Sequence, residues 1–237
     1  MLPLLAAGVG LGAATGVAWQ SARRRARRAQ QLHRALVDLL LNTLSAGDVA
    51  TAEHSRRVAV LTDALAVAYR LDRRARARLR LAALLHDMGK IDDDFFDIVH
   101  SRQQLSPEQR QQIKHHPHKS AHILEPLEQV HPGIMAIVSS HHECWDGSGY
   151  PQGLRGEQIP LEARIIAAAD VFDALTQRRS YREPLSIEQA LDELRRGAGS
   201  RFDPELVARI QQPPVLDAWR ETVRHGCSAV RTGERED

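Results

Sequence analysis

Two pairs of adjacent residues with metal-ligating side chains stand out in this chain, at His86-Asp87 and at His141-His142. Neighbouring residues on a helix point about 100° apart, so both members of a pair can serve one site only where a cavity wraps around the helix end. A site for two metal ions provides such a cavity, because Asp87 can place one carboxylate oxygen on each ion. Mixed imidazole and carboxylate ligands suit divalent or trivalent first-row metals, and without thiolates a structural zinc site is disfavoured. The two pairs therefore predict a site for two metal ions.

The segments around both pairs resemble those of a known family. His86-Asp87-Met88-Gly89-Lys90 resembles the hallmark of the HD superfamily of metal-dependent phosphohydrolases. The segment that begins at His141 and ends in Gly149-Tyr150-Pro151 is similar to that of the HD-GYP branch. The resemblance spans roughly residues 54–207. It implies an HD-type helical bundle around two divalent or trivalent metal ions, Fe or Mn, and hydrolysis of cyclic di-GMP to linear pGpG, with GMP as the alternative end product.

The resemblance also implies the remaining metal ligands. His54, followed by Arg56-Arg57-Val58, matches a histidine on the first helix of the family, and His116 matches the histidine of a His-Pro step, although His115 beside it offers an alternative imidazole. The implied ligand set is His54, His86, Asp87, His116, His141, His142 and Asp170. Family members that hold a third metal carry a Glu four residues before the first histidine. Ala50 occupies that position here, so two ions are expected.

The same resemblance implies roles in catalysis and substrate binding. Asp87 and Lys90 are the implied catalytic residues, with Lys90 placed to neutralise charge that develops on a phosphate, or else lying as a solvated surface lysine. The implied substrate contacts are Lys90, Tyr150, Asp173, Arg179 and Arg182. Guanidinium groups suit both guanine and phosphate, but Arg178, Arg179 and Arg182 could instead form a solvent-facing cluster. Residues 92–96 depart from the family pattern, which leaves their local geometry open.

The elements that hold these residues are expected to be helices, giving an all-α fold. Aromatic residues are only 4% of the chain, Ala, Leu and Arg abound, and no hairpin signal appears. Apolar stripes predict a helix over 58–68 and another that ends near Gly89, which puts His86 and Asp87 in its last turn. Ser106 with Gln109 predicts the start of a helix that carries His115 and His116.

Further helices are expected in the second half of the chain. A helix over 132–140 should deliver His141 and His142, and a loop rich in Gly and Pro should follow over 146–160. An apolar helix over 159–176 carries Asp170 and Asp173. Ser186 with Gln189, and Asp203 with Pro204, predict the starts of two more helices.

The N-terminal segment Leu2 to Trp19 contains no charged residue. At 1.5 Å per residue its roughly 18 residues just reach across the ~30 Å core of a bilayer. Arginines follow directly, so the positive-inside rule predicts a single-pass protein of the inner (cytoplasmic) membrane with its catalytic domain in the cytoplasm. Glycines at 8, 12 and 16 share one face and would allow a homodimer. A cleaved signal peptide and a start-site artefact are the competing interpretations, and the first lacks the basic n-region that a signal peptide needs.

Domain boundaries and partners complete these expectations. We expect an anchor at 1–20, a basic juxtamembrane segment and linker helix at 21–47, the catalytic domain at 48–212 and a C-terminal tail at 213–237. Subtracting the six arginines of residues 1–34 from the net charge of +2 leaves about −4, which does not favour binding a nucleic acid polymer. Cys144 and Cys227 suggest no disulfide framework and suit a reducing cytosol.

The expected partners are cyclic di-GMP, a second copy of the chain and a signalling protein. Two other functions are open. One is an HD-type hydrolase of another nucleotide, which the Gly149-Tyr150-Pro151 loop disfavours. The other is a non-catalytic module that binds cyclic di-GMP or a protein, which the intact ligand set disfavours.

Overall fold

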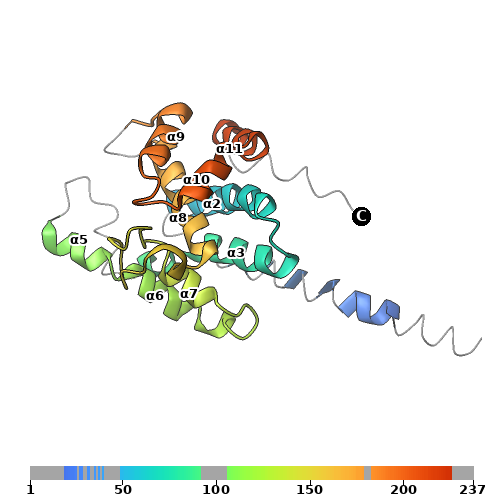
Figure 1. The fold of residues 1–237 in the computed structure, drawn as a ribbon. Coiled ribbons are helices and arrows are strands. Elements are labelled where there is room, and N and C mark those ends of the chain that lie inside the picture. The colour runs from blue at the N-terminus through green and yellow to red at the C-terminus, as the bar shows by residue number, and fades with distance from the viewer. Residues whose placement is uncertain are drawn as a thin grey trace, which may run out of the picture.

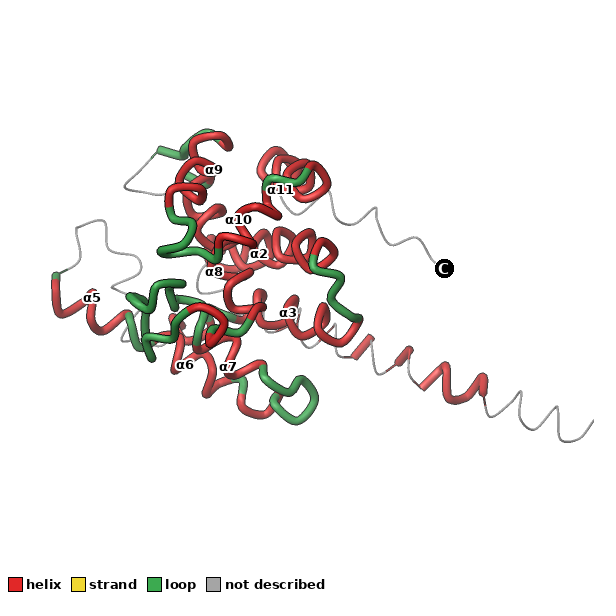
Figure 2. The backbone as a smooth tube through the Cα atoms, viewed as in Figure 1, coloured by secondary structure: helices red, strands yellow, loops and turns green. Residues whose placement is uncertain are grey.

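The protein forms a bundle of helices around a central helix, α2 (Figures 1 and 2). The computed structural model describes residues 19–25, 27–28, 31–32, 35, 37, 39, 49–91, 106–178 and 183–225. Within these ranges the elements are helices and turns, with no β-strand. The all-α prediction is therefore confirmed. Helices α9 and α11 lie at one end of the bundle, and α5, α6 and α7 lie at the other (Figure 1).

Helix α2 (Val49–Ala68) forms the centre of the core. It packs against α3 (Arg73–Leu85), α8 (Leu161–Thr176) and α11 (Pro213–His225). Val58, Leu61 and Leu65 recur at helical spacing along its buried face, and each is at most 1% exposed. Burying such a side chain fully contributes about 1.5–3 kcal/mol, so this face anchors α2 in the bundle. The same helix carries His54, which is thereby held in a fixed position.

Helix α3 ends earlier than its sequence predicts, at Leu85. His86 is its C-cap, and a short 3-10 helix over Met88–Ile91 follows. Gly89 allows this turn to pack closely, since a Cβ there would lie 2.5 Å from the carbonyl oxygen of His116. The Gly89 amide donates to Ser120 Oγ at 2.8 Å. These contacts bring His86 and Asp87 beside helix α6.

The helix predicted to carry His115 and His116 is two helices in the structure. Helix α5 (Pro107–Ile113) begins with the expected capping box of Ser106 and Gln109, but it stops before the histidines. Helix α6 (His116–Ile123) starts afresh with a proline in its first turn, so His116 lies at its beginning. Helix α7 (Ile134–Ser139) follows and ends just before His141.

The C-terminal helices extend the bundle further than expected. Helices α9 (Ile187–Arg196) and α10 (Pro204–Ile210) begin at their predicted caps. The tail expected from residue 213 is wrong in its first part, because α11 occupies 213–225 and packs on α2. Trp219 is fully buried, and its indole donates to the carbonyl oxygen of Leu61 at 3.0 Å. The core therefore continues through α11.

The N-terminal membrane anchor requires correction. Its residues before Trp19, including the glycines at 8, 12 and 16, lie outside the described residues. In the part of the chain that the structure describes, no helix is both long and apolar enough to cross a membrane. Helix α2 has 20 residues, but Glu53, Arg56, Arg57 and Asp63 interrupt it, and a span needs about 20 mostly apolar residues. The prediction of a single-pass inner-membrane protein is contradicted by this finding.

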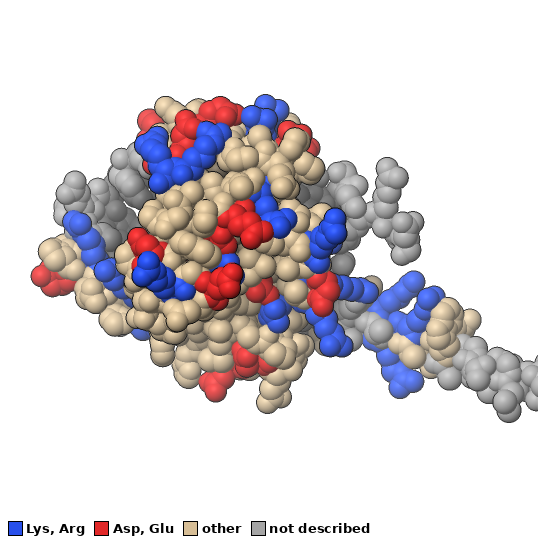
Figure 3. Space-filling model, in the orientation of Figure 1, with Lys and Arg blue, Asp and Glu red and all other residues tan. Residues whose placement is uncertain are grey.

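Charged side chains are mixed over the surface seen in Figure 3. Lys and Arg lie among Asp and Glu on the helical bundle, while arginines gather on the helical residues 19–25 and 27–28 that extend from it. Three other predicted features lie outside the described residues: the segment 92–96, Arg179 with Arg182, and the polar end of the tail at 231–237.

Candidate metal centre

The seven residues of the expected ligand set converge at the end of the bundle where α2, α3, α6, α7 and α8 meet. His54, His86 and Asp170 form one group whose ligand atoms lie within 4.8 Å of one another. His116, His141 and His142 form a second such group. Their burial ranges from complete, at His86, to partial, at His142 and Asp170. The structure thus brings together side chains from five separate segments, with two places that could hold a metal.

Asp87 lies between the two groups. Its Oδ2 atom is 3.5 Å from Nε2 of His86, and its Oδ1 atom is 3.3 Å from Nε2 of His116. One carboxylate oxygen therefore faces each group, which is the arrangement of a bridging ligand. Lys90 Nζ lies 2.7 Å from Oδ2 of Asp87 and holds the carboxylate in place.

Three of the histidines are oriented by the backbone. Nδ1 of His86, His116 and His141 lies 2.8, 2.7 and 2.6 Å from the carbonyl oxygen three residues earlier. A carbonyl oxygen only accepts, so each Nδ1 carries the proton and each Nε2 is left with a lone pair. Metal-ligating histidines are commonly fixed in this way, with the second ring nitrogen donating to a backbone or carboxylate oxygen.

The spacing of the Nε2 atoms fits a metal ion. His116 Nε2 lies 3.4 Å from that of His141 and 3.2 Å from that of His142. With His116 and His141 protonated at Nδ1, their two lone pairs face one another and need a cation or proton between them. Metal–nitrogen bonds of about 2.0–2.1 Å place neighbouring ligand nitrogens roughly 3.0–3.4 Å apart. The observed separations match that expectation.

Two buried polar atoms at the centre have no hydrogen-bond partner among the described residues: His86 Nε2 and Asp87 Oδ1. A buried polar atom left unsatisfied costs about 1–3 kcal/mol, so such atoms are uncommon in folded proteins. A bound cation would satisfy both. The donor set, its spacing and these two atoms all fit a metal.

The charge states of these groups also suit metal binding. Burial lowers the pKa of His86 and His141, and it lowers that of His142 to about 3, so these imidazoles are neutral near pH 7. Burial alone would raise the pKa of Asp87, but Lys90, His86 and His116 hold it well below its usual range. The pKa of Asp170 is likewise held well below its usual range, against burial, by His54. Neutral imidazoles and ionised carboxylates are the forms that bind metals.

His54 differs from the other histidines because carboxylates face both of its ring nitrogens. Nδ1 lies 2.8 Å from Oδ2 of Asp173, and Nε2 lies 3.1 Å from Oδ1 of Asp170. Burial opposes the charged form, but the hydrogen bonds to Asp170 and Asp173 raise the pKa of His54 to about 9. Without a metal, this imidazole is therefore protonated near pH 7.

Asp173 is placed differently from the substrate contact that its sequence position suggested. It is 2% exposed, contacts Nδ1 of His54 and is not among the pocket-lining residues. Arg57 donates to it from Nε at 2.7 Å and from Nη2 at 3.0 Å. The sequence predicts no role for Arg57 in the site, although Arg57 lies three residues after His54 and therefore on the same side of α2. The structure thus joins Arg57, Asp173 and His54 in one buried chain of hydrogen bonds.

The loop after the second histidine pair is fastened by Glu143. The residue is 4% exposed. Its carboxylate accepts hydrogen bonds from the backbone amides of Gln152, Gly153 and Leu154 at 2.7, 3.2 and 3.1 Å. Gly149 is required by the resulting close approach, because a Cβ there would lie 2.2 Å from the amide nitrogen of Cys144. The loop therefore folds back on its own start.

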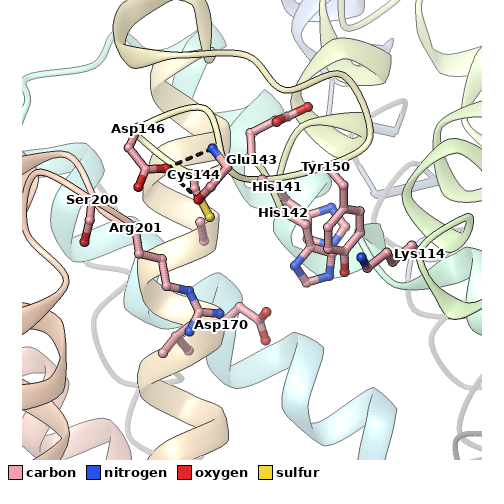
Figure 4. A pocket seen from close by; sticks show the side chains of 14 residues that line it. Lys114, His141, His142, Glu143, Cys144, Asp146, Tyr150, Asp170, Ser200 and Arg201 are labelled. Carbon is pink, nitrogen blue, oxygen red and sulfur yellow. Dashed lines mark hydrogen bonds between the residues drawn. The ribbon is translucent and has the colours of Figure 1, made fainter. Parts of the chain in front are cut away.

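This loop forms one wall of a pocket of about 530 Å³ that opens onto the metal centre (Figure 4). Such a volume lies in the range of small-molecule sites. Tyr150 stacks on His142, with ring centroids 5.0 Å apart and planes 26° apart, and both line the pocket with Asp170. Lys90 is not among the pocket-lining residues.

The two alternatives for the His-Pro histidine are now distinguished by burial. His115 is exposed, whereas His116 is 1% exposed and lies among the ligand atoms. Tyr150 lies at the pocket as a substrate contact would. Arg179 and Arg182 lie outside the described residues, so their expected contacts stay a prediction.

Comparison with known proteins agrees with this geometry. A family model described as "HD domain" matches residues 38–206. The 3'3'-cGAMP-specific phosphodiesterase 2 of Vibrio cholerae is 37% identical over 194 residues, which cover 79% of this chain and 35% of that protein. The cyclic di-GMP phosphodiesterase response regulator RpfG of Xanthomonas campestris is 42% identical over 130 residues, which cover 54% of this chain and 34% of that protein. The chain spans about a third of the length of these two relatives.

A solved structure supports the fold. The crystal structure of the cyclic GMP-AMP specific phosphodiesterase V-cGAP3 of Vibrio cholerae aligns with a TM-score of 0.62 at 21% identity, covering 81% of this chain and 51% of that one. The family model matches well over half of the chain, and Gly149-Tyr150-Pro151 follows the second histidine pair. This chain therefore belongs to the HD domain family, in its HD-GYP branch.

Proposed function

We propose that this chain is a metal-dependent phosphodiesterase that hydrolyses cyclic di-GMP to linear pGpG, with GMP as the alternative end product. The observation that carries the proposal is Asp87, whose two carboxylate oxygens face separate histidine groups beside an open pocket. Relatives named as cyclic di-GMP phosphodiesterases support the substrate class. In this proposal the catalytic domain begins near residue 48 and extends through α11 to His225.

The proposed ligands are divided between two ions. His54, His86 and Asp170 would hold one, and His116, His141 and His142 would hold the other, with Asp87 shared. When bound, a pair of divalent cations, which we propose to be Fe or Mn, supplies Lewis-acid activation of a water and of the phosphate oxygens. Ala50 stands where a further acidic ligand would be needed for a third ion.

The protein's own residues prepare the site for this chemistry. The backbone carbonyls fix the rings of His86, His116 and His141 with Nε2 facing inward. These imidazoles therefore need not turn when a metal ion binds. Lys90 holds the Asp87 carboxylate where two ions would share it, and its ammonium group would offset negative charge that develops on the phosphate as the ester bond breaks. We assign Asp87 and Lys90 the catalytic roles.

The pocket wall would receive the nucleotide. The Tyr150 ring, held against His142, offers an aromatic face beside the ligand atoms. Such a face can stack on a guanine base. In this proposal Arg179 and Arg182 also contact the substrate, because guanidinium groups bind guanine and phosphate through paired hydrogen bonds.

The test is hydrolysis of cyclic di-GMP by the full chain, loaded without oxygen with Fe(II) or Mn(II). The expected result is linear pGpG or GMP from the wild type and no product from a His86→Ala/Asp87→Ala double variant. A matched control is His115→Ala, which removes an exposed histidine next to a proposed ligand and should keep activity. Two bound metals per chain without any product from cyclic di-GMP would refute the substrate assignment.

A second substrate, 3'3'-cGAMP, is favoured by a specific observation. A relative 37% identical over most of this chain is named as specific for 3'3'-cGAMP. Cyclic di-GMP and 3'3'-cGAMP differ in one base, so both present the same phosphodiester to the metal centre. Comparing kcat/KM for the two substrates with one enzyme preparation decides between them, and a tenfold preference for 3'3'-cGAMP would reverse our assignment.

A further inference from the structure

The pocket contains two basic side chains that the proposed mechanism does not use, Lys114 and Arg201. They come from distant parts of the chain. Lys114 is the C-cap of α5, and Arg201 lies in the turn before α10. Figure 4 shows them on opposite sides of the pocket, with Lys114 next to Tyr150 and Arg201 next to Asp170. Both are therefore positioned near a bound substrate.

The acidic side chains of the same pocket are already engaged. Glu143 accepts three backbone amides, and Asp146 accepts from the amide and hydroxyl of Ser148 at 2.9 and 2.6 Å. Asp170 belongs to the proposed ligand set. These contacts hold the carboxylates of Glu143 and Asp146 in place, so Lys114 and Arg201 are the side chains of this lining whose charge suits an anion.

Arg201 is the better placed of the two cations. Its backbone is tied to the histidine loop, because its carbonyl oxygen accepts from the amide of Trp145 at 3.2 Å and the preceding carbonyl, of Ser200, accepts from Asp146 at 2.8 Å. Among the described residues, no acidic side chain pairs with its guanidinium group, whose carbon lies 5.4 Å from the ring of Phe202. Lys114, by contrast, lies over the Tyr150 ring at 5.5 Å.

A cyclic dinucleotide carries two phosphodiester groups, each with one negative charge. Only one of them can occupy the metal centre during a turnover, so the other needs a cation elsewhere in the pocket. A guanidinium group matches the oxygens of a phosphate through two parallel hydrogen bonds. We infer that Arg201 binds the second, non-reacting phosphate of the cyclic dinucleotide, an inference that rests on the proposed function.

The test compares two substrates in the Mn-loaded full chain. Cyclic di-GMP has a second phosphate, whereas bis(p-nitrophenyl) phosphate has a single phosphodiester and nothing for Arg201 to bind. Arg201→Gln should raise KM for cyclic di-GMP about tenfold and leave kcat within twofold. It should leave hydrolysis of bis(p-nitrophenyl) phosphate unchanged. Arg201→Lys keeps the charge but loses the paired hydrogen-bond geometry. Its KM for cyclic di-GMP should lie between the values of the wild type and Arg201→Gln.

Two further measurements make the result specific. Metal content should be the same in wild type and Arg201→Gln, and the Kd of cyclic di-GMP for the metal-free full chain, which cannot turn the ligand over, should weaken by a similar factor of about ten in calorimetry. The matched control is Arg224→Gln, at an exposed arginine of α11 outside the pocket. This variant should change neither the KM nor the Kd for cyclic di-GMP.

The outcomes separate this inference from the proposed function. If the wild type hydrolyses cyclic di-GMP and Arg201→Gln shows the same KM and Kd, the inference is wrong and the function stands. An equal loss of activity on bis(p-nitrophenyl) phosphate would also overturn it, because Arg201 would then act at the metal centre. A wild type that cleaves bis(p-nitrophenyl) phosphate but neither binds nor cleaves cyclic di-GMP would overturn both.

Discussion

The imidazole of His54 is held by Asp173, whose Oδ2 atom lies 2.8 Å from Nδ1, and the same carboxylate is held in turn by Arg57. This chain of hydrogen bonds turns Nε2 of His54 toward Asp170 and the metal centre. The other anchored histidines rely on rigid backbone carbonyls. His54 alone relies on a side chain that a single substitution can change.

Asp173→Asn should therefore weaken metal binding without unfolding the protein. An amide can still accept from Arg57, but its NH₂ group cannot accept the Nδ1 proton, so His54 loses the tautomer that exposes Nε2. Loss of such a supporting partner typically weakens metal affinity roughly 10- to 100-fold. Metal content and competition with a chelator measure the change. Asp203→Asn is the matched control, because Asp203 is also a buried aspartate paired with a partly buried arginine, Arg164, but belongs to neither ligand group. If Asp173→Asn binds metal as tightly as Asp203→Asn does, the role assigned to Asp173 is contradicted.

Metal binding should release about one proton near pH 7. The pKa of His54 is raised to about 9, so its Nε2 is protonated at pH 7 and must lose that proton to bind a metal. His142, with a pKa of about 3, is already neutral and releases none. Calorimetry of Mn(II) binding in buffers of different ionisation enthalpy counts the protons. The release should vanish near pH 10, and metal affinity should rise with pH up to about 9. No proton release at pH 7 would contradict the assignment.

The metal-free protein should be most stable near pH 6.5. The folded pKa of His54 is above its ordinary value of 6.5, so its contribution is complete below pH 6.5 and is lost as the pH rises through about 9. The folded pKa of His142 is below 6.5, so its neutral form stabilises the fold above pH 6.5, and this contribution is lost as the pH falls toward 3. Thermal unfolding in a chelator from pH 4 to 10 tests both limbs. A melting temperature that rises steadily across this range would refute the prediction.

Glu143→Gln should loosen the loop that carries Tyr150. The carboxylate accepts three backbone amides, and a glutamine would present an NH₂ group to at least one of these donors. One unsatisfied buried donor costs about 1–3 kcal/mol, and this cost weakens the attachment of the loop to residue 143. We expect kcat/KM to fall at least tenfold while metal content stays the same. Glu157→Gln, at an exposed position of the same loop, should leave kcat/KM and metal content unchanged.

Trp219 should be among the residues on which stability most depends. It is fully buried, packs on Phe172 with ring centroids 4.6 Å apart and donates to Leu61. Trp219→Ala should cost about 3–5 kcal/mol in the free energy of unfolding, and Trp219→Phe should cost less, since it loses mainly the hydrogen bond. Urea unfolding measures both. A loss below 1 kcal/mol for the alanine variant would mean that α11 is not part of the core.

The ligand types could be recognised from the sequence because their chemistry is local. Adjacent His86-Asp87 and His141-His142 already imply a cavity at a helix end, and the motifs around them mark the family. Helix starts at Ser106, Ser186 and Asp203 were also predictable, because capping depends on residues only two or three positions apart. Helix ends were harder. The break before His116 and the early end of α3 depend on the packing of Gly89 against α6, which local sequence does not encode.

The sequence by itself thus determined the helical class and the family, and it indicated the residues that we propose as metal ligands. Only the tertiary structure decided that Asp173 supports His54 instead of facing the pocket, that Arg57 completes this support, and that Arg201 reaches the pocket from the turn before α10. The physical reason is that hydrogen bonds and charge pairs between residues more than 50 positions apart depend on how helices pack, and no local periodicity records that packing. The placement of α11 follows the same rule, because Trp219 finds its partner on α2.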